Sequence, residues 1–271
     1  MTATQRHHVE VADGIELYVE ESGSGRPLVF IPGWTMTTEV FARQVPHFAD
    51  RYRVVTYDPR CQGRSTKTVN GISYAQHGRD LARLIDALAL KDAVLAPWSY
   101  GCLKVWEMFR QRGTRDTAGV VWIDLSPQQV QRDEGDWCEG DIAGLTATQR
   151  ALADDYRATT RAFCAGMWQG TPPADELDWV VDQSLKTPQY ATCLLAADGM
   201  SRDETDMARA TDGALSMLHI VHEAKADAAR AFVARNCPAA MVEGLGFHFM
   251  FWEYADRFNA LVDGFLAEND L

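Results

Sequence analysis

Long apolar runs are absent from this chain. None of its stretches approaches the ~20 consecutive apolar residues that a helix needs to cross a bilayer. The N-terminal segment M-T-A-T-Q-R-H-H-V-E-V also lacks the apolar centre of a signal peptide. We therefore expect no secretory leader and no membrane partner.

Closely paired cysteines are also absent. The six cysteines are scattered, with no C-x-x-C pair and no metal-type spacing with histidine: Cys61, Cys102, Cys138, Cys164, Cys193 and Cys237. A cytoplasmic protein with reduced thiols and no metal site is the simplest interpretation of this pattern.

Positive charge is scarce in this chain. It carries 26 basic against 38 acidic side chains, for a formal net charge of -12, and its Lys and Arg residues form no cluster. Phosphate backbones repel such a chain, so we expect no nucleic-acid partner.

Internal repeats and low-complexity linkers are missing too. The 271 residues, 46% of them apolar, are enough for one large domain that carries an inserted lobe.

Strand and helix patterns alternate along most of the chain. Residues 8–11 and 15–19 alternate in polarity around Asp13-Gly14, which predicts a β-hairpin. Apolar runs predict six further strands at 27–31, 52–57, 93–96, 119–124, 217–221 and 240–243. Helical spacing predicts helices at 40–48, 74–89, 102–112, 227–236 and from residue 253. This order predicts an α/β fold with a mostly parallel sheet covered by helices on both faces.

The alternation stops between residues 126 and 212. This segment has an all-helical pattern, so we predict a core made of residues 1–125 and 213–271 with a helical cap at 126–212. The segment contains Trp137, Trp168 and Trp179. These side chains either line a substrate pocket or form the lobe's own core.

A serine stands at a strand-to-helix junction in A-P-W-S-Y-G-C, residues 96–102. Ser99 either caps the following helix or is held at a sharp corner where its hydroxyl attacks a substrate. His248 lies between the last predicted strand and the last helix, in G-L-G-F-H-F. A neutral imidazole there can accept a proton from serine and return it to a leaving group.

Four motifs together resemble the α/β-hydrolase fold superfamily over nearly the whole chain. They are P-G-W at 32–34, D-P-R-C-Q-G-R-S at 58–65, W-S-Y-G at 98–101 and G-F-H-F at 246–249. The resemblance implies that Ser99 is the nucleophile and His248 the base. Pro97 replaces the first glycine of the usual G-x-S-x-G pattern, and Gly101 retains the second.

The acidic member of the triad has two possible positions in this family. Asp124 ends the sixth strand, whereas Glu223 and Asp227 lie in a short loop after the seventh. An aspartate that ends a buried strand needs a partner such as His248, so we favour Asp124 and keep the other two as alternatives.

The resemblance also implies an oxyanion hole and a pocket wall. The backbone N–H groups of Trp34 and Tyr100 would hold the oxyanion. The aromatic side chains of Trp34, Trp98, Tyr100 and Trp168 are the predicted pocket lining.

We therefore expect a cofactor-free serine hydrolase of a small, mostly apolar or aromatic ester or lactone. Some lactone hydrolases of this fold share the acid after the sixth strand. The alternative is a cofactor-independent dioxygenase of the quinolone ring-cleaving type, which uses a His-Asp dyad and shares the P-G-W turn. Two residues argue against this alternative: Tyr100 follows Ser99, where that group would have a histidine, and Thr35 follows Trp34. An intact Ser, His and Asp set argues against a non-catalytic binding protein.

Overall fold

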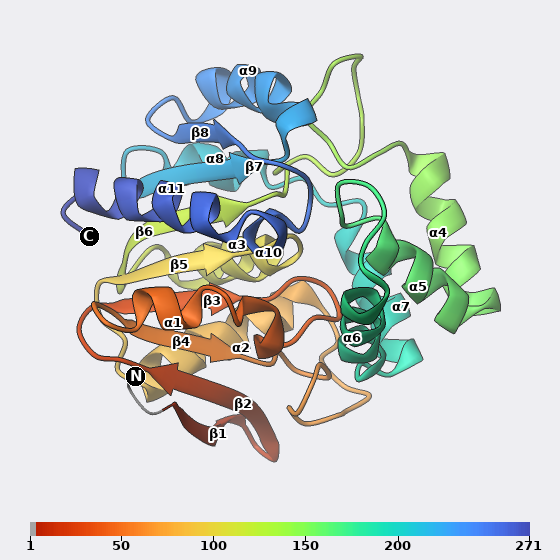
Figure 1. The fold of residues 1–271 in the computed structure, drawn as a ribbon, viewed down its shortest axis with the longest axis horizontal. Helices are drawn as coiled ribbons and strands as arrows, with labels where there is room; N and C mark the ends of the chain where they lie inside the picture. The colour runs from red at the N-terminus through yellow and green to blue at the C-terminus, as the bar shows by residue number, and fades with distance from the viewer. Residues whose placement is uncertain (1–3) are drawn as a thin grey trace.

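One eight-stranded sheet forms the centre of the protein (Figure 1). A computed structural model describes residues 4–271; residues 1–3, part of the segment that lacks a leader pattern, lie outside the described residues. The strand order is β1-β2-β4-β3-β5-β6-β7-β8, and β2 runs antiparallel to both of its neighbours while all pairs from β4 onward are parallel. The strands are β1 (Gln5–Ala12), β2 (Ile15–Ser22), β3 (Pro27–Ile31), β4 (Arg53–Tyr57), β5 (Ala93–Pro97), β6 (Thr117–Ile123), β7 (Ser216–Val221) and β8 (Met241–Gly244).

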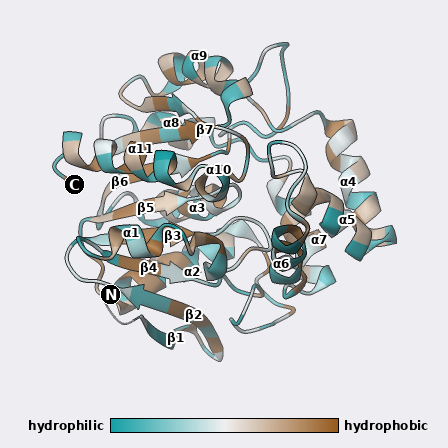
Figure 2. Ribbon diagram, in the orientation of Figure 1, coloured by the Kyte–Doolittle hydropathy of each residue, from teal (hydrophilic) through white to brown (hydrophobic). Residues whose placement is uncertain are grey.

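Side-chain alternation along the parallel strands builds two hydrophobic layers. In β5, Leu95 packs into the first layer and Val94 into the second. In β6, Val120 packs into the first layer and Val121 into the second. The first layer is covered by α2 (Tyr74–Ala87), α3 (Gly101–Arg112) and α9 (Ala226–Asn236), and the second by η1 (Thr38–Phe41), α1 (Val45–Phe48), α10 (Met250–Glu253) and α11 (Ala255–Glu268). In Figure 2, hydrophobic colour is concentrated in the central strands between these helices.

The predicted fold class is confirmed in its central feature, a mostly parallel sheet with helices on both faces. One expected helix is divided: residues 40–48 form η1 and α1 in place of one helix. Pro46 lacks an N–H and crowds the carbonyl four residues earlier, so a continuous helix cannot pass through it.

A group of helices lies beyond the carboxyl ends of the parallel strands (Figure 1). The segment between β6 and β7 contains α4 (Ile142–Asp154), α5 (Tyr156–Ala165), α6 (Ala174–Leu185), α7 (Gln189–Gly199) and α8 (Thr205–Thr211), and the short η2 (Glu223–Lys225) follows β7. The expectation that residues 126–212 are all helical is wrong for the stretch before α4. Gly135 has a φ of +82° there, and the Asp136 carboxylate accepts backbone N–H groups from Arg132 and Asp133, which stabilises turns instead of a helix.

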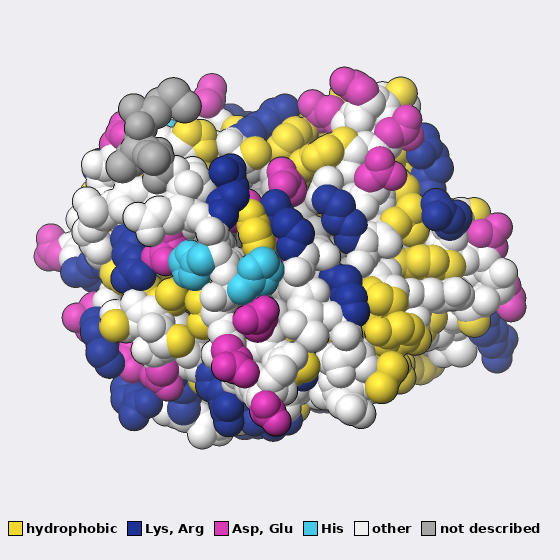
Figure 3. All heavy atoms as spheres, turned by 90° about the horizontal axis from the view of Figure 1, so that it is seen from below, with side chains coloured by type: hydrophobic (Ala, Val, Ile, Leu, Met, Phe, Trp, Pro, Cys, Tyr) yellow, Lys and Arg dark blue, Asp and Glu magenta, His cyan; other side chains and the backbone are white. Residues whose placement is uncertain are grey.

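The exposed surface is mixed in charge. On the face seen in Figure 3, Lys and Arg side chains lie among Asp and Glu side chains. Within residues 4–271, the structure contains no helix with the length and hydropathy needed to span a bilayer.

Candidate active site

Ser99 occupies a strained corner between β5 and α3. Its φ is +52°, in the left-handed region that non-glycine residues rarely adopt. Two hydrogen bonds enforce this corner: the Ser99 N–H donates to the Ile123 carbonyl at 2.8 Å, and the Cys102 N–H donates to the Ser99 carbonyl at 2.8 Å. Ser99 therefore stands just beyond the carboxyl end of β5, where it lines a cavity together with His248.

Gly101 allows the helix to start close to the neighbouring strand. A Cβ atom at this position would lie 2.5 Å from the carbonyl oxygen of Ile31. Pro97, in the position where the family pattern has glycine, is the last residue of β5 and pairs with Ile31. The corner thus retains the glycine at which the helix meets β3, and it accommodates proline at the strand end.

His248 and Asp124 are brought together from the ends of two different elements. His248 lies in the loop between β8 and α10, and its Nδ1 is 2.6 Å from Oδ2 of Asp124. Asp124 directly follows β6 with a φ of +47°, and its Oδ1 accepts the backbone N–H of His222 at 2.8 Å. Both carboxylate oxygens are therefore engaged, which fixes the orientation of the imidazole.

The environment of Asp124 keeps its carboxyl group ionised. Burial alone would raise its pKa, but the hydrogen bond and charge of His248, with further contributions from His222, outweigh burial and hold the pKa below the usual range. An ionised carboxylate at this position can stabilise a protonated His248 during a reaction.

Neither of the two alternative acids forms an ion pair with His248, which is paired with Asp124. Asp227 is fully exposed in the first turn of α9 and pairs with Arg230 at 3.0 Å. Glu223 lies in η2, with its carboxylate near Gly244. Asp124 is thus the carboxylate that bonds to the imidazole in this structure.

Two backbone N–H groups flank the serine. Tyr100 follows Ser99 at the start of α3, and Trp34 follows Gly33 in the turn after β3. A Cβ atom at Gly33 would lie 3.1 Å from the Cβ atom of Ser99, so this turn packs directly against the serine. Within residues 4–271, neither N–H donates a hydrogen bond, and both are free to bind an oxyanion.

A cavity of about 210 Å³ opens beside Ser99. Ser99, His248, Trp34 and Tyr100 all line it. The remaining lining residues come from the loop after β6 and from the helices beyond the sheet: Leu125, Glu139, Leu145, Thr148, Phe163, Ala196 and Met200. These seven residues could not be predicted from the sequence, because no local motif marks them and only the tertiary fold brings them to Ser99.

The prediction that Trp98 and Trp168 line the pocket is corrected by the structure, because neither side chain reaches the cavity. Trp98 is 1% exposed, stacks on Phe249, and donates its indole N–H to the His248 carbonyl at 3.0 Å. Trp168 packs edge-on against Phe249, with 4.8 Å between the ring centroids. Both tryptophans support the loop that carries His248.

The other two predicted aromatic positions, Trp34 and Tyr100, do face the cavity. The Trp34 ring contacts Phe163 edge-on, with 5.0 Å between the ring centroids. Its indole N–H donates to the Thr192 carbonyl in α7 at 3.1 Å. Trp34 therefore connects the turn after β3 to the helices that complete the cavity.

The remaining tryptophans between β6 and β7 lie away from the cavity. Trp137 packs against His219 and Phe232, as part of the hydrophobic layer under α9. Trp179 stacks on Trp252, with 4.6 Å between the ring centroids. Both side chains therefore serve packing, which was one of the two interpretations of these tryptophans.

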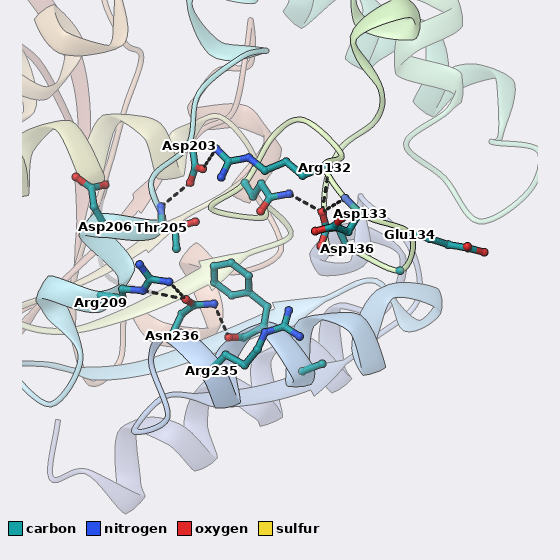
Figure 4. A pocket seen from close by; sticks show the side chains of 14 residues that line it. Arg132, Asp133, Glu134, Asp136, Asp203, Thr205, Asp206, Arg209, Arg235 and Asn236 are labelled. Atoms are coloured by element: carbon teal, nitrogen blue, oxygen red, sulfur yellow. Dashed lines mark hydrogen bonds and ion pairs between the residues drawn. The ribbon is translucent and has the colours of Figure 1, made fainter.

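A larger hollow of about 750 Å³ lies elsewhere, between the loop before α4 and helices α8 and α9 (Figure 4). Two of its arginines have partners within the hollow: Arg132 binds Asp203, and Arg209 donates to the Asn236 side chain at 2.7 Å. Of the residues between 4 and 271, no serine, cysteine or histidine lines it. The smaller cavity therefore holds the groups that can carry out nucleophilic chemistry.

No metal-type cluster of three or more His, Cys, Asp or Glu side chains is present in residues 4–271. The cavity beside Ser99 offers the hydroxyl of Ser99, the imidazole of His248 and the carboxylate of Glu139, while Asp124 binds the imidazole without lining the cavity. That a substrate reacts there without a cofactor remains a prediction.

Comparison with known families agrees with this architecture. Residues 26–162, half of the chain, match the model of the alpha/beta hydrolase fold family. The protein belongs to this family, and its sheet order and the corner at Ser99 have the geometry of that fold.

Individual relatives are more distant. The chain is 30% identical to a non-heme haloperoxidase from Rhodococcus erythropolis over 127 residues, or 46% of each protein, so the match spans about half of the relative's length. Among solved structures it resembles a bromoperoxidase from Bacillus anthracis (TM-score 0.87, 22% identity, 97% of this chain and 100% of the other). It also resembles an esterase from Exiguobacterium antarcticum (TM-score 0.88, 20% identity, 97% and 100%).

Proposed function

We propose that the protein is a serine hydrolase that cleaves small carboxylic esters or lactones through an acyl-enzyme. The observation that carries this proposal is the placement of Ser99. It is held at φ +52° on the corner after β5 and lines the same cavity as His248, which is bonded to Asp124. The esterase from Exiguobacterium antarcticum has the same fold, which is consistent with this activity.

In the first half of the proposed reaction, the Ser99 oxygen attacks the carbonyl carbon and its proton passes to Nε2 of His248. Asp124 holds Nδ1 of the ring and stabilises the imidazolium. The carbonyl oxygen becomes an oxyanion between the N–H groups of Trp34 and Tyr100. The intermediate then expels the alkoxide, which takes the proton from His248.

In the second half, water attacks the acyl group on Ser99. His248 removes a proton from this water, the oxyanion forms again between the same two N–H groups, and Ser99 leaves with the proton returned by His248. A free carboxylic acid is released. For a lactone, the alcohol and the acid remain in one product molecule.

The cavity indicates the size and polarity of the substrate. About 210 Å³ lined mainly by Trp34, Leu125, Phe163 and Met200 accommodates a small apolar group. We propose that the helices between β6 and β7 act as a cap, since Leu145 and Thr148 of α4 and Ala196 of α7 complete the cavity wall.

Glu139 gives this apolar cavity a negative side. It lines the cavity, and its charge adds to the effect of burial in raising the pKa of the Tyr100 phenol. We expect Glu139→Gln to increase kcat/KM for the anionic ester 4-nitrophenyl succinate by about fivefold, because one repulsive charge at short range in a wet site is worth about 1 kcal/mol.

For the neutral ester 4-nitrophenyl butyrate, kcat/KM should change by less than about twofold in the same variant. Glu134→Gln is the matched control, because Glu134 lies in the same loop but lines the larger hollow instead. Equal changes for both esters, or an effect of the control variant, would contradict a role of Glu139 in charge selection.

The proposed activity is tested with a panel of 4-nitrophenyl esters and simple lactones, with acid release followed by pH-stat. We expect turnover of short-chain esters by the native protein and loss of turnover in Ser99→Ala. Turnover that persists in folded Ser99→Ala would overturn the acyl-enzyme mechanism and leave the His248–Asp124 pair as the reactive unit.

A further inference from the structure

Lys104 is a fully buried cation in the second turn of α3. Its side chain is 0% exposed. Among the described residues it has no carboxylate partner; its Nζ donates instead to the Pro32 carbonyl and, at 3.4 Å, to the Gly33 carbonyl. An unpaired buried lysine is unfavourable for folding, so its position beside this turn calls for a functional explanation.

The Gly33 carbonyl belongs to the peptide group whose N–H is that of Trp34. Gln62 adds a second donor to this carbonyl, with Nε2 at 3.0 Å, and the same nitrogen binds the Met36 carbonyl at 3.0 Å. Donors on the oxygen of an amide draw electron density from its nitrogen, and hydrogen bonds connected in this way strengthen one another. The N–H group of this same peptide unit, that of Trp34, is free and lies beside Ser99.

We propose that Lys104 is a positioning residue for the oxyanion hole. By binding the carbonyls of Pro32 and Gly33, its ammonium fixes the turn and makes the Trp34 N–H a stronger donor to the developing oxyanion. This inference rests on the proposed function, because it requires an oxyanion at Trp34. The effect appears in kcat, since the oxyanion charge exists only in the transition state and the intermediates.

The charge of Lys104 changes near neutral pH. Burial lowers its pKa to about 7, slightly opposed by Cys102. The other titratable groups near it change charge elsewhere: burial raises the pKa of the Cys102 thiol well above its usual value, and burial with the charges of Lys104 and Arg60 lowers the pKa of His77. Arg60 itself is held by Asp80 at 2.7 Å. The ammonium is present below pH 7 and is lost as the pH rises through 7, so its contribution to kcat declines in that direction.

The first test compares kinetics of 4-nitrophenyl acetate hydrolysis in Lys104→Met and the native protein. We expect kcat to fall about tenfold at pH 6 while KM changes less than about twofold, because methionine fills the site but donates nothing to the carbonyls. The difference in kcat between the variant and the native protein should be smaller at pH 8.5, where the ammonium has lost its proton. Lys91→Met is the matched control, because Lys91 is exposed and pairs with Asp116. An unchanged kcat in folded Lys104→Met would overturn the proposal.

The second test does not depend on whether Lys104→Met folds. In His248→Gln, which removes the imidazole beside Ser99, the backbone amide shift of Trp34 is followed by NMR from pH 5.5 to 9 with ¹⁵N-tryptophan. We expect this signal, assigned with Trp34→Phe, to titrate with a midpoint near pH 7. A Trp34 signal that stays constant while the ¹³C signal of the Lys104 side chain shows the ammonium losing its proton would overturn the proposal.

The two proposals fail in different ways. If the native protein neither hydrolyses esters nor reacts with a fluorophosphonate, the proposed function fails, even when the Trp34 signal titrates. If the native protein does react and Lys104→Met reacts equally fast at pH 6, the inference about Lys104 alone fails.

Discussion

The variant His248→Ala is expected to lose ester hydrolysis, with kcat reduced by about 10⁵-fold. His248 lines the cavity together with Ser99, and its Nδ1 is held by Asp124 at 2.6 Å. The proposed mechanism assigns to this imidazole both the removal of the serine proton and its return to the leaving alcohol, so the variant lacks the base for both steps. Initial rates with 4-nitrophenyl acetate measure the effect.

The control for this variant is His47→Ala. His47 pairs with Asp263 of α11 at the surface and does not line the cavity, so its removal should leave the rates unchanged. Circular dichroism checks that both variants fold. Retained activity in His248→Ala would contradict the hydrolase mechanism and the His-Asp dioxygenase alternative alike, because each needs this base.

The second large effect is expected for Asp124→Asn, with kcat lower by about 10⁴-fold. The asparagine amide is close in shape to the carboxylate, but it can present an N–H to Nδ1 and so favour the wrong tautomer of His248. It also removes the negative charge that stabilises the imidazolium. KM should change little, because Asp124 does not line the cavity.

Asp227→Asn provides the matched comparison. Asp227 is an alternative acid from the sequence, but it is fully exposed and pairs with Arg230. Its replacement should leave kcat within about twofold of the native value. A larger loss in Asp227→Asn than in Asp124→Asn would place the functional acid after β7 and contradict the assignment of this role to Asp124.

The sheet could be predicted because apolar runs and their spacing are local properties of the sequence. The continuous apolar run of β3 and the helical spacing of Leu81, Leu84 and Ile85 in α2 indicate their elements directly. The stretch before α4 was harder, since the Asp136 side chain stabilises its turns through bonds that residue types alone do not reveal.

Side-chain placement near Ser99 was predicted only in part. Trp98 continues the alternation of Val94 and Ala96, so its side chain enters the hydrophobic layer under α11 rather than the cavity. Extending the two-residue alternation of β5 past the end of the strand would have predicted that the Trp98 side chain is buried in this layer. Trp168, by contrast, is placed by Phe249, a contact between distant segments for which the sequence carries no signal.

Intact mass after treatment with a fluorophosphonate tests the central claim, that Ser99 is an activated nucleophile, most directly. We expect a single adduct on the native protein, mapped to Ser99 by peptide mass spectrometry and absent from Ser99→Ala. No adduct on the folded native protein would contradict the claim. Oxygen uptake with hydroxyquinolone substrates would then test the remaining His-Asp chemistry.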